Sequence, residues 1–127
     1  MRDPRGVLLS RIRGDMLSYE NVNTEAKVLC RKMLEDMWII HSLKQQHPGS
    51  VLINSYEQLT RFPMSSLEKI LQVTGMPRSE AVRDWLEANS VNGANISSAW
   101  RTRISPTMKA TIDAECKELY KAAGYPI

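Results

Sequence analysis

Apolar residues recur at three- and four-residue intervals along much of the chain, which is the period of an amphipathic helix. The longest such stretch covers residues 24–46. Its apolar stripe consists of Ala26, Leu29, Cys30, Met33, Leu34, Met37, Ile40 and Leu43. His47-Pro48-Gly49 ends the stretch, because proline and glycine both resist continuation of a helix. The pattern therefore predicts one long helix over these residues.

A proline and a glycine bound a shorter helix near the start of the chain. Pro4 stands near the first helical position and Gly14 follows the last apolar residue. Proline is tolerated at a helix start and glycine favours its end. A charged turn precedes this helix, so the segment looks like the downstream half of a strand-turn-helix unit.

Serine caps predict two helices in the second half of the chain. Ser65, with Glu68 three residues later, forms a capping-box pattern. Ser105 precedes Pro106, which places serine at an N-cap and proline at the first helical position. Another helix is predicted between these two. Residues 90–104, rich in Asn, Ser and Gly, are predicted to form a long loop.

One segment is typical of a β-strand. Residues 51–56 read Val-Leu-Ile-Asn-Ser-Tyr and follow a Pro-Gly turn. Their near-continuous hydrophobicity favours a strand covered on both faces, as in a parallel sheet. Because a single strand leaves backbone groups unpaired, we expect part of an α/β fold, mostly helical with one clear strand, and not an all-α domain.

Composition narrows the class of protein further. The chain has 127 residues and a net charge of +3, which fits one small domain or a piece of a larger one. Its basic residues are scattered, so the charge indicates no nucleic-acid partner. No apolar run approaches the roughly 20 residues of a membrane-spanning helix. Cys30 and Cys116 have no metal-binding spacing, and they fit equally one disulfide or two buried thiols.

The most informative chemistry lies in residues 2–11, Arg-Asp-Pro-Arg-Gly-Val-Leu-Leu-Ser-Arg. A guanidinium before a helix and a hydroxyl two turns into it can converge on one phosphate, since the first gives a bidentate fork and the second a neutral donor. The helix start adds affinity for anions. Arg2 and Ser10 are thus a candidate anion site. From the residues alone, a proline-initiated helix with surface arginines explains the same pattern.

This stretch resembles the 3′-phosphate-binding segment of the Golgi carbohydrate sulfotransferases, which reads Arg-Asp-Pro-Arg-x-Val-x-x-Ser-Arg. These enzymes sulfate the 6-hydroxyl of N-acetylglucosamine, galactose or N-acetylgalactosamine. Similar blocks follow in the same order: the helix around Cys30, residues 48–59 with their Tyr-Glu pair, residues 95–101 ending in Ala-Trp-Arg, and residues 116–126 with Gly-Tyr-Pro. The resemblance spans nearly the whole chain.

The resemblance implies a donor, an acceptor and a compartment. The donor is 3′-phosphoadenosine 5′-phosphosulfate (PAPS), and no metal is implied. Arg2 and Ser10 would bind its 3′-phosphate, and Arg101 would be a further nucleotide contact, whereas Arg103 is interpreted as a solvated charge. The acceptor would be a glycan of the keratan, chondroitin or N-glycan type. Relatives are type II membrane proteins of the Golgi lumen, where the two cysteines would form a disulfide.

The chain also departs from the family. Ser55 stands where relatives usually carry arginine, and Gln58 where they carry aspartate. None of the six glycines belongs to a glycine-rich phosphate loop. The catalytic base also lies upstream in relatives, so no catalytic residue is assigned.

We therefore expect residues 1–127 to be the C-terminal part of a sulfotransferase domain, without its 5′-phosphosulfate loop and inactive alone. Two alternatives stay open. One is a degenerate paralogue of such an enzyme, and the other is a non-catalytic helical interaction module that presents Met37-Trp38-Ile39-Ile40 to a partner.

Overall fold

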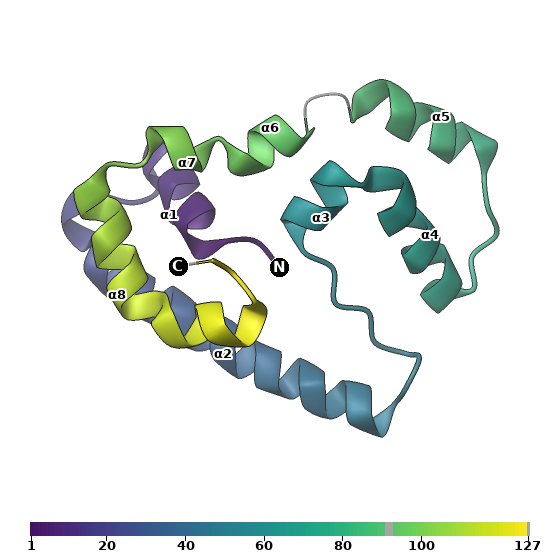
Figure 1. The fold of residues 1–127 in the computed structure, drawn as a ribbon, viewed down its shortest axis with the longest axis horizontal. Coiled ribbons are helices and arrows are strands. Elements are labelled where there is room, and N and C mark those ends of the chain that lie inside the picture. The colour runs from purple at the N-terminus through teal and green to yellow at the C-terminus, as the bar shows by residue number, and fades with distance from the viewer. Residues whose placement is uncertain (91–92, 127) are drawn as a thin grey trace.

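Helices make up every regular element of the computed structural model, which describes residues 1–90 and 93–126 (Figure 1). A short 3-10 turn, Tyr19–Asn21, precedes the second helix. The helices are α1 (Pro4–Arg13), α2 (Val22–Gln46), α3 (Tyr56–Arg61), α4 (Pro63–Thr74), α5 (Glu80–Asn89), α6 (Gly93–Ser98), α7 (Trp100–Arg103) and α8 (Pro106–Ala123).

The hydrophobic core lies where α2 and α8 pack side by side, with α1 across one end (Figure 1). Its buried side chains include Leu8, Leu9, Ile12, Ala26, Cys30, Met37, Met108, Ile112, Cys116, Leu119 and Tyr120. Cys30 of α2 and Cys116 of α8 form a disulfide. The long helix predicted from the apolar stripe is confirmed, and of the two states open to the cysteines the structure has the bonded one.

The remaining helices pack more loosely beside this core. α3 contacts both α4 and α6, and α5 contacts α4. α5 has no buried residue, and α4 buries only Ser66. Because apolar burial is the main stabilising term, the stability of the described chain resides mostly in α1, α2, α7 and α8.

The predicted strand over residues 51–56 is wrong, and so is the α/β fold class, because residues 1–90 and 93–126 contain no strand. A strand needs a partner ladder for its backbone groups. Here the backbone of this segment pairs with only one residue from another part of the described chain, Met1. The Met1 amine donates to the Asn54 carbonyl at 2.8 Å, and the Met1 carbonyl accepts the Tyr56 amide at 2.6 Å. The Ser55 hydroxyl accepts the Gln58 amide at 3.0 Å and caps α3, so the chain turns into a helix.

The loop predicted over residues 90–104 also needs correction. Two short helices, α6 and α7, occupy most of it. The hydroxyls of Ser97 and Ser98 both donate to the Ala94 carbonyl, at 3.0 and 2.8 Å, which suits a short helix of polar residues. Trp100 is buried and anchors α7 to the core.

The exposure of residues 37–40 bears on the interaction module that the sequence left open as an alternative. Of the apolar run proposed to meet a partner, Met37 is buried in the core, whereas Trp38 and Ile39 are 65% and 58% exposed.

Across residues 1–90 and 93–126, no helix has both the length and the apolar character to cross a membrane.

Candidate anion pocket beside α1

The turn that starts α1 is fixed by its own side chains. Asp3 is the N-cap, and its Oδ1 accepts the Arg5 amide at 2.9 Å. Pro4 follows at the first helical position, as predicted. The Asp3 amide donates to Oε1 of Glu57 at 2.9 Å, which ties the turn to α3. The residues on either side of Asp3 are therefore held in a defined conformation.

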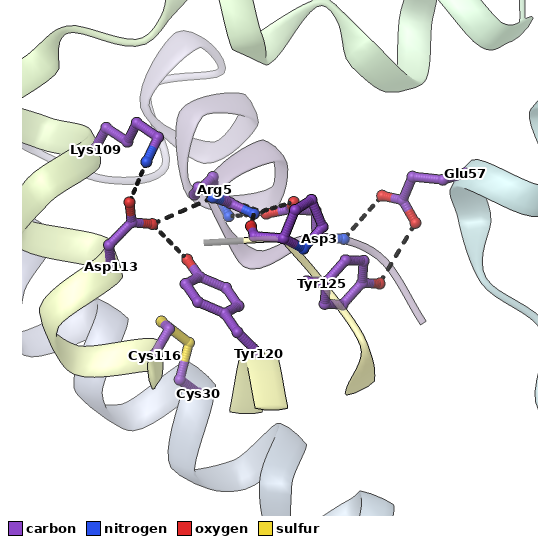
Figure 2. A network of polar contacts seen from close by, with 10 residues as sticks. Asp3, Arg5, Cys30, Glu57, Lys109, Asp113, Cys116, Tyr120 and Tyr125 are labelled. Carbon is purple, nitrogen blue, oxygen red and sulfur yellow. Dashed lines mark hydrogen bonds and ion pairs between the residues drawn. A yellow bond between two sulfur atoms is a disulfide. The ribbon is translucent and has the colours of Figure 1, made fainter. Parts of the chain in front are cut away.

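Arg5 is buried inside the protein and does not face solvent. Arg5 and Asp3 are each 1% exposed. Their side chains form a bidentate pair, Nε to Oδ1 at 3.0 Å and Nη2 to Oδ2 at 2.8 Å (Figure 2). Nη1 donates to Oδ1 of Asp113 at 3.4 Å, and Nη2 also donates to the Pro126 carbonyl at 2.8 Å. This arginine joins α1 to α8 and to the C-terminal segment, and four of its five N–H donors are occupied.

Two aromatic rings enclose the same guanidinium. The Arg5 Cζ lies 4.5 Å from the ring centroids of both Trp100 and Tyr120. Burial alone would lower the pKa of Arg5, but the hydrogen bond and the charge of Asp3 outweigh burial and raise it. Burial raises the pKa of Tyr120 well above its usual value, and the bond from its hydroxyl to Asp113 adds to the rise. Arg5 therefore stays charged and Tyr120 stays neutral at physiological pH.

A second tie crosses the same region through Glu57 (Figure 2). The Tyr125 hydroxyl donates to Oε2 of Glu57 at 3.4 Å, while Oε1 accepts the Asp3 amide. Burial and the nearby charge of Glu57 raise the pKa of Tyr125 above its usual range. Both oxygens of the carboxylate accept hydrogen bonds within the fold, so Glu57 acts as a structural link.

A pocket of about 360 Å³ opens beside this cluster, between α1 on one side and α6 and α7 on the other. Its polar side chains are those of Arg2, Ser10, Arg13 and Arg103. Leu9, Ile96 and Trp100 supply apolar surface. Among residues 1–90 and 93–126, none that lines the pocket is acidic. An anion would therefore meet several positive charges and no opposing carboxylate.

Arg2 lines that pocket and also a second hollow, which Tyr56 and Leu59 line as well. Its guanidinium lies over the Tyr56 ring, with Cζ 4.8 Å from the centroid. Its Nε is buried and has no hydrogen-bond partner among the described residues. A Cβ at Gly6 would lie 3.4 Å from that Nε and 3.0 Å from Cδ1 of Trp100, so glycine leaves room for both side chains. A buried donor without a partner costs about 1–3 kcal/mol, which indicates a partner from outside the chain.

The structure brings together two of the three predicted site residues. Arg2 and Ser10 line the same pocket, as the motif in residues 2–11 predicts. Arg101 is exposed and stacks on the Trp100 ring, with Cζ 4.7 Å from its centroid, outside this pocket. Its contact with a nucleotide stays a prediction.

Two of the arginines that line the pocket are not among the site residues predicted from the sequence. Arg103 is interpreted there as a solvated charge, and Arg13 is not considered. The signal for Arg13 is helical spacing, because Gly6, Ser10 and Arg13 follow at intervals of four and three residues and so share one face of α1. No comparable signal links Arg103 to α1, because their proximity depends on how α7 packs.

Comparison with known proteins then decides the family, since the sulfotransferase domain matches residues 1–94. The chain belongs to the sulfotransferase domain family. This sulfotransferase chain is 26% identical to mouse (Mus musculus) carbohydrate sulfotransferase 1, over 98% of its own length and 37% of the relative's. The human (Homo sapiens) carbohydrate sulfotransferase 1 is also 26% identical, over 100% of the chain and 38% of the relative.

The zebrafish (Danio rerio) carbohydrate sulfotransferase 1 is 21% identical over 98% of the sulfotransferase chain and 37% of the relative. These matches confirm the predicted likeness to carbohydrate sulfotransferases. The chain spans less than two-fifths of the length of these curated relatives. No solved structure matches it.

Proposed function

We propose that this chain is the C-terminal, nucleotide-binding part of a PAPS-dependent carbohydrate sulfotransferase. Arg2 and Ser10 hold the 3′-phosphate of the donor. The observation that carries the proposal is the buried Nε of Arg2, which lacks a partner among the described residues and belongs to a side chain that shares a pocket with Ser10.

The residues present fit that group chemically. A phosphate monoester carries close to two negative charges at neutral pH and offers three acceptor oxygens. The Arg2 guanidinium donates in a fork that matches phosphate, and the Ser10 hydroxyl adds a neutral donor. Ile96 and Trp100 give the pocket an apolar wall against which a purine can pack. When bound, PAPS supplies the sulfuryl group that is transferred.

Two further observations support an acceptor class and a compartment. The matched relatives are named carbohydrate sulfotransferases, which supports a sugar hydroxyl as acceptor. We propose that this hydroxyl belongs to a glycan of the keratan, chondroitin or N-glycan type. The buried Cys30–Cys116 disulfide supports an oxidising compartment. We accordingly place the intact enzyme in the Golgi lumen, as a type II membrane protein.

We further propose that these residues bind the donor but do not transfer sulfate alone. No histidine or carboxylate lines the pocket among the described residues, and a general base must lie within reach of the proton that it removes. The measurement is transfer of radiolabelled sulfate from PAPS to a keratan- or chondroitin-type acceptor. Turnover by the purified chain would contradict this part of the proposal.

The binding proposal predicts calorimetric affinity for adenosine 3′,5′-bisphosphate, the donor without its sulfuryl group. Arg2→Ala is expected to weaken binding by about ten- to hundredfold, because a hydrogen bond to a charged group contributes about 1.5–3 kcal/mol. Ser10→Ala is expected to weaken it less, by about two- to tenfold, because it removes a single neutral donor.

Arg11→Ala provides the matched control. Like Arg2→Ala, this variant removes one positive charge. Arg11 lies outside the pocket, and its Nη1 pairs with Oε2 of Glu25 at 3.8 Å. A second control is adenosine 5′-monophosphate, whose affinity Arg2→Ala should leave unchanged because that ligand has no 3′-phosphate. Equal losses for the Arg2 and Arg11 variants would show non-specific attraction only. Absence of binding at millimolar bisphosphate would remove the proposal and favour the interaction module.

A further inference from the structure

The arginines of this chain fall into three groups by their partners. Within residues 1–90 and 93–126, one group pairs with carboxylates: Arg5, Arg11, Arg31, Arg78 and Arg83. Arg61 and Arg101 have no such pair in that part of the chain but stack on the adjacent rings of Phe62 and Trp100. The other three without a carboxylate partner there are Arg2, which also stacks on the Tyr56 ring, Arg13 and Arg103, and all three line the same pocket.

The position of Arg103 is set by the buried cluster. Trp100 is buried, stacks on the Arg5 guanidinium at 4.5 Å and lines the pocket. Arg103 comes three residues later, on the same face of α7. The Ile104 amide donates to the Trp100 carbonyl at 2.9 Å and closes this helical turn. The ring that fixes α7 thereby carries Arg103 to the pocket.

The neighbouring Arg101 has a different placement. It belongs to the same four-residue helix and stacks on the same Trp100 ring, yet it lies outside the pocket. Two arginines with equal charge and similar exposure thus differ in whether they face the pocket. Like charges that gather without a counter-charge repel one another, so an anion between them would relieve that repulsion.

We infer that Arg103 of α7, together with Arg13 of α1, binds the phosphate held by Arg2 and Ser10 and completes the anion site. This inference rests on the proposed function, since it assumes that the pocket takes the 3′-phosphate. The site then draws its charge from two helices far apart in the sequence. Its preference for a doubly charged phosphate monoester depends on α7 being docked against α1.

The test compares Arg103→Ala with Arg61→Ala, an exposed arginine outside the pocket, in the whole chain, by calorimetry with adenosine 3′,5′-bisphosphate. Arg103→Ala is expected to weaken binding by about three- to tenfold, which is the effect of one exposed charge-assisted hydrogen bond. Arg13→Ala should behave alike. Arg61→Ala should stay within about twofold of the unaltered protein. Circular dichroism checks that every variant is folded, which the exposure of these side chains favours.

Each outcome has a definite meaning. Equal effects of Arg103→Ala and Arg61→Ala, or a larger effect of the latter, would overturn the inference. If Arg2→Ala still weakens binding in that case, the proposed function survives without Arg103. If the unaltered chain binds no bisphosphate, both fail together.

Discussion

Replacement of Arg5 by alanine is expected to lower the free energy of unfolding by about 3–5 kcal/mol, the usual cost of removing one partner of a buried ion pair. Asp3 would lose both side-chain hydrogen bonds from the guanidinium in a site where it is 1% exposed. Asp113 and the Pro126 carbonyl would each lose a donor. The space between the Trp100 and Tyr120 rings would also empty, which adds a cavity term.

Urea unfolding followed by circular dichroism measures this loss. The matched control is Arg31→Ala, because Arg31 is 71% exposed and its pair with Glu35 spans 3.9 Å at the surface of α2. Such exposed pairs contribute about 0–1 kcal/mol. Arg5→Lys should fall between the two, since lysine keeps the charge but not the bidentate fork or the stacking. A loss below about 1 kcal/mol for Arg5→Ala would show that the cluster is not a main support of the fold.

Removal of the Cys30–Cys116 disulfide is the second large effect, expected to cost about 2–5 kcal/mol. The bond joins residues 86 positions apart and closes a loop that contains most of the chain. In the chain-entropy account, cross-linking so long a loop restricts the unfolded state strongly. The bond also lies between α2 and α8, the two helices that form the core.

The measurement is the urea midpoint of the Cys30→Ala/Cys116→Ala double variant, compared with that of the unaltered protein before and after reduction. Reduction should lower the midpoint of the unaltered protein and leave that of the double variant unchanged. Mass spectrometry with alkylation supplies the chemical check, because two thiols should become available only after reduction. Two labels without reductant, or no shift on reduction, would contradict the bonded state.

Helices with strong local signals could be predicted from the sequence. The apolar stripe runs through most of the 25 residues of α2, and such a long repeat identifies a helix without tertiary information. Pro4 and the Ser105-Pro106 pair mark the starts of α1 and α8, because a helix start is decided by groups within one turn.

Local sequence signals gave wrong predictions where a second local signal competed with them, or where the element also needed a tertiary partner. The capping box predicts that a helix starts at Ser65, yet α4 begins two residues earlier, at Pro63. The fixed φ of proline suits the first helical position, and it prevailed over the cap. Residues 51–56 are apolar enough for a strand, but a strand also needs neighbours, which hydrophobicity alone does not reveal. The Ser55 cap turned the end of this segment into α3.

The candidate site also has one part that local sequence predicts and one part that depends on tertiary packing. Arg2 and Ser10 belong to one continuous motif, so their shared pocket could be predicted from a turn and a helix. Arg103 reaches the pocket only because Trp100 packs on Arg5, a contact between residues distant in sequence. α6 and α7 were expected to be loop for a related reason: each is six residues or shorter, and helices so short depend on tertiary packing.

The central claim is that Arg2 and Ser10 hold a 3′-phosphate, and a crystal structure of the chain with adenosine 3′,5′-bisphosphate tests it most directly. The account predicts 3′-phosphate oxygens within about 3.2 Å of the Arg2 guanidinium nitrogens and of the Ser10 hydroxyl, with the Nε of Arg2 donating. A nucleotide bound elsewhere, or one bound in the pocket with its 3′-phosphate turned away from both side chains, would contradict it.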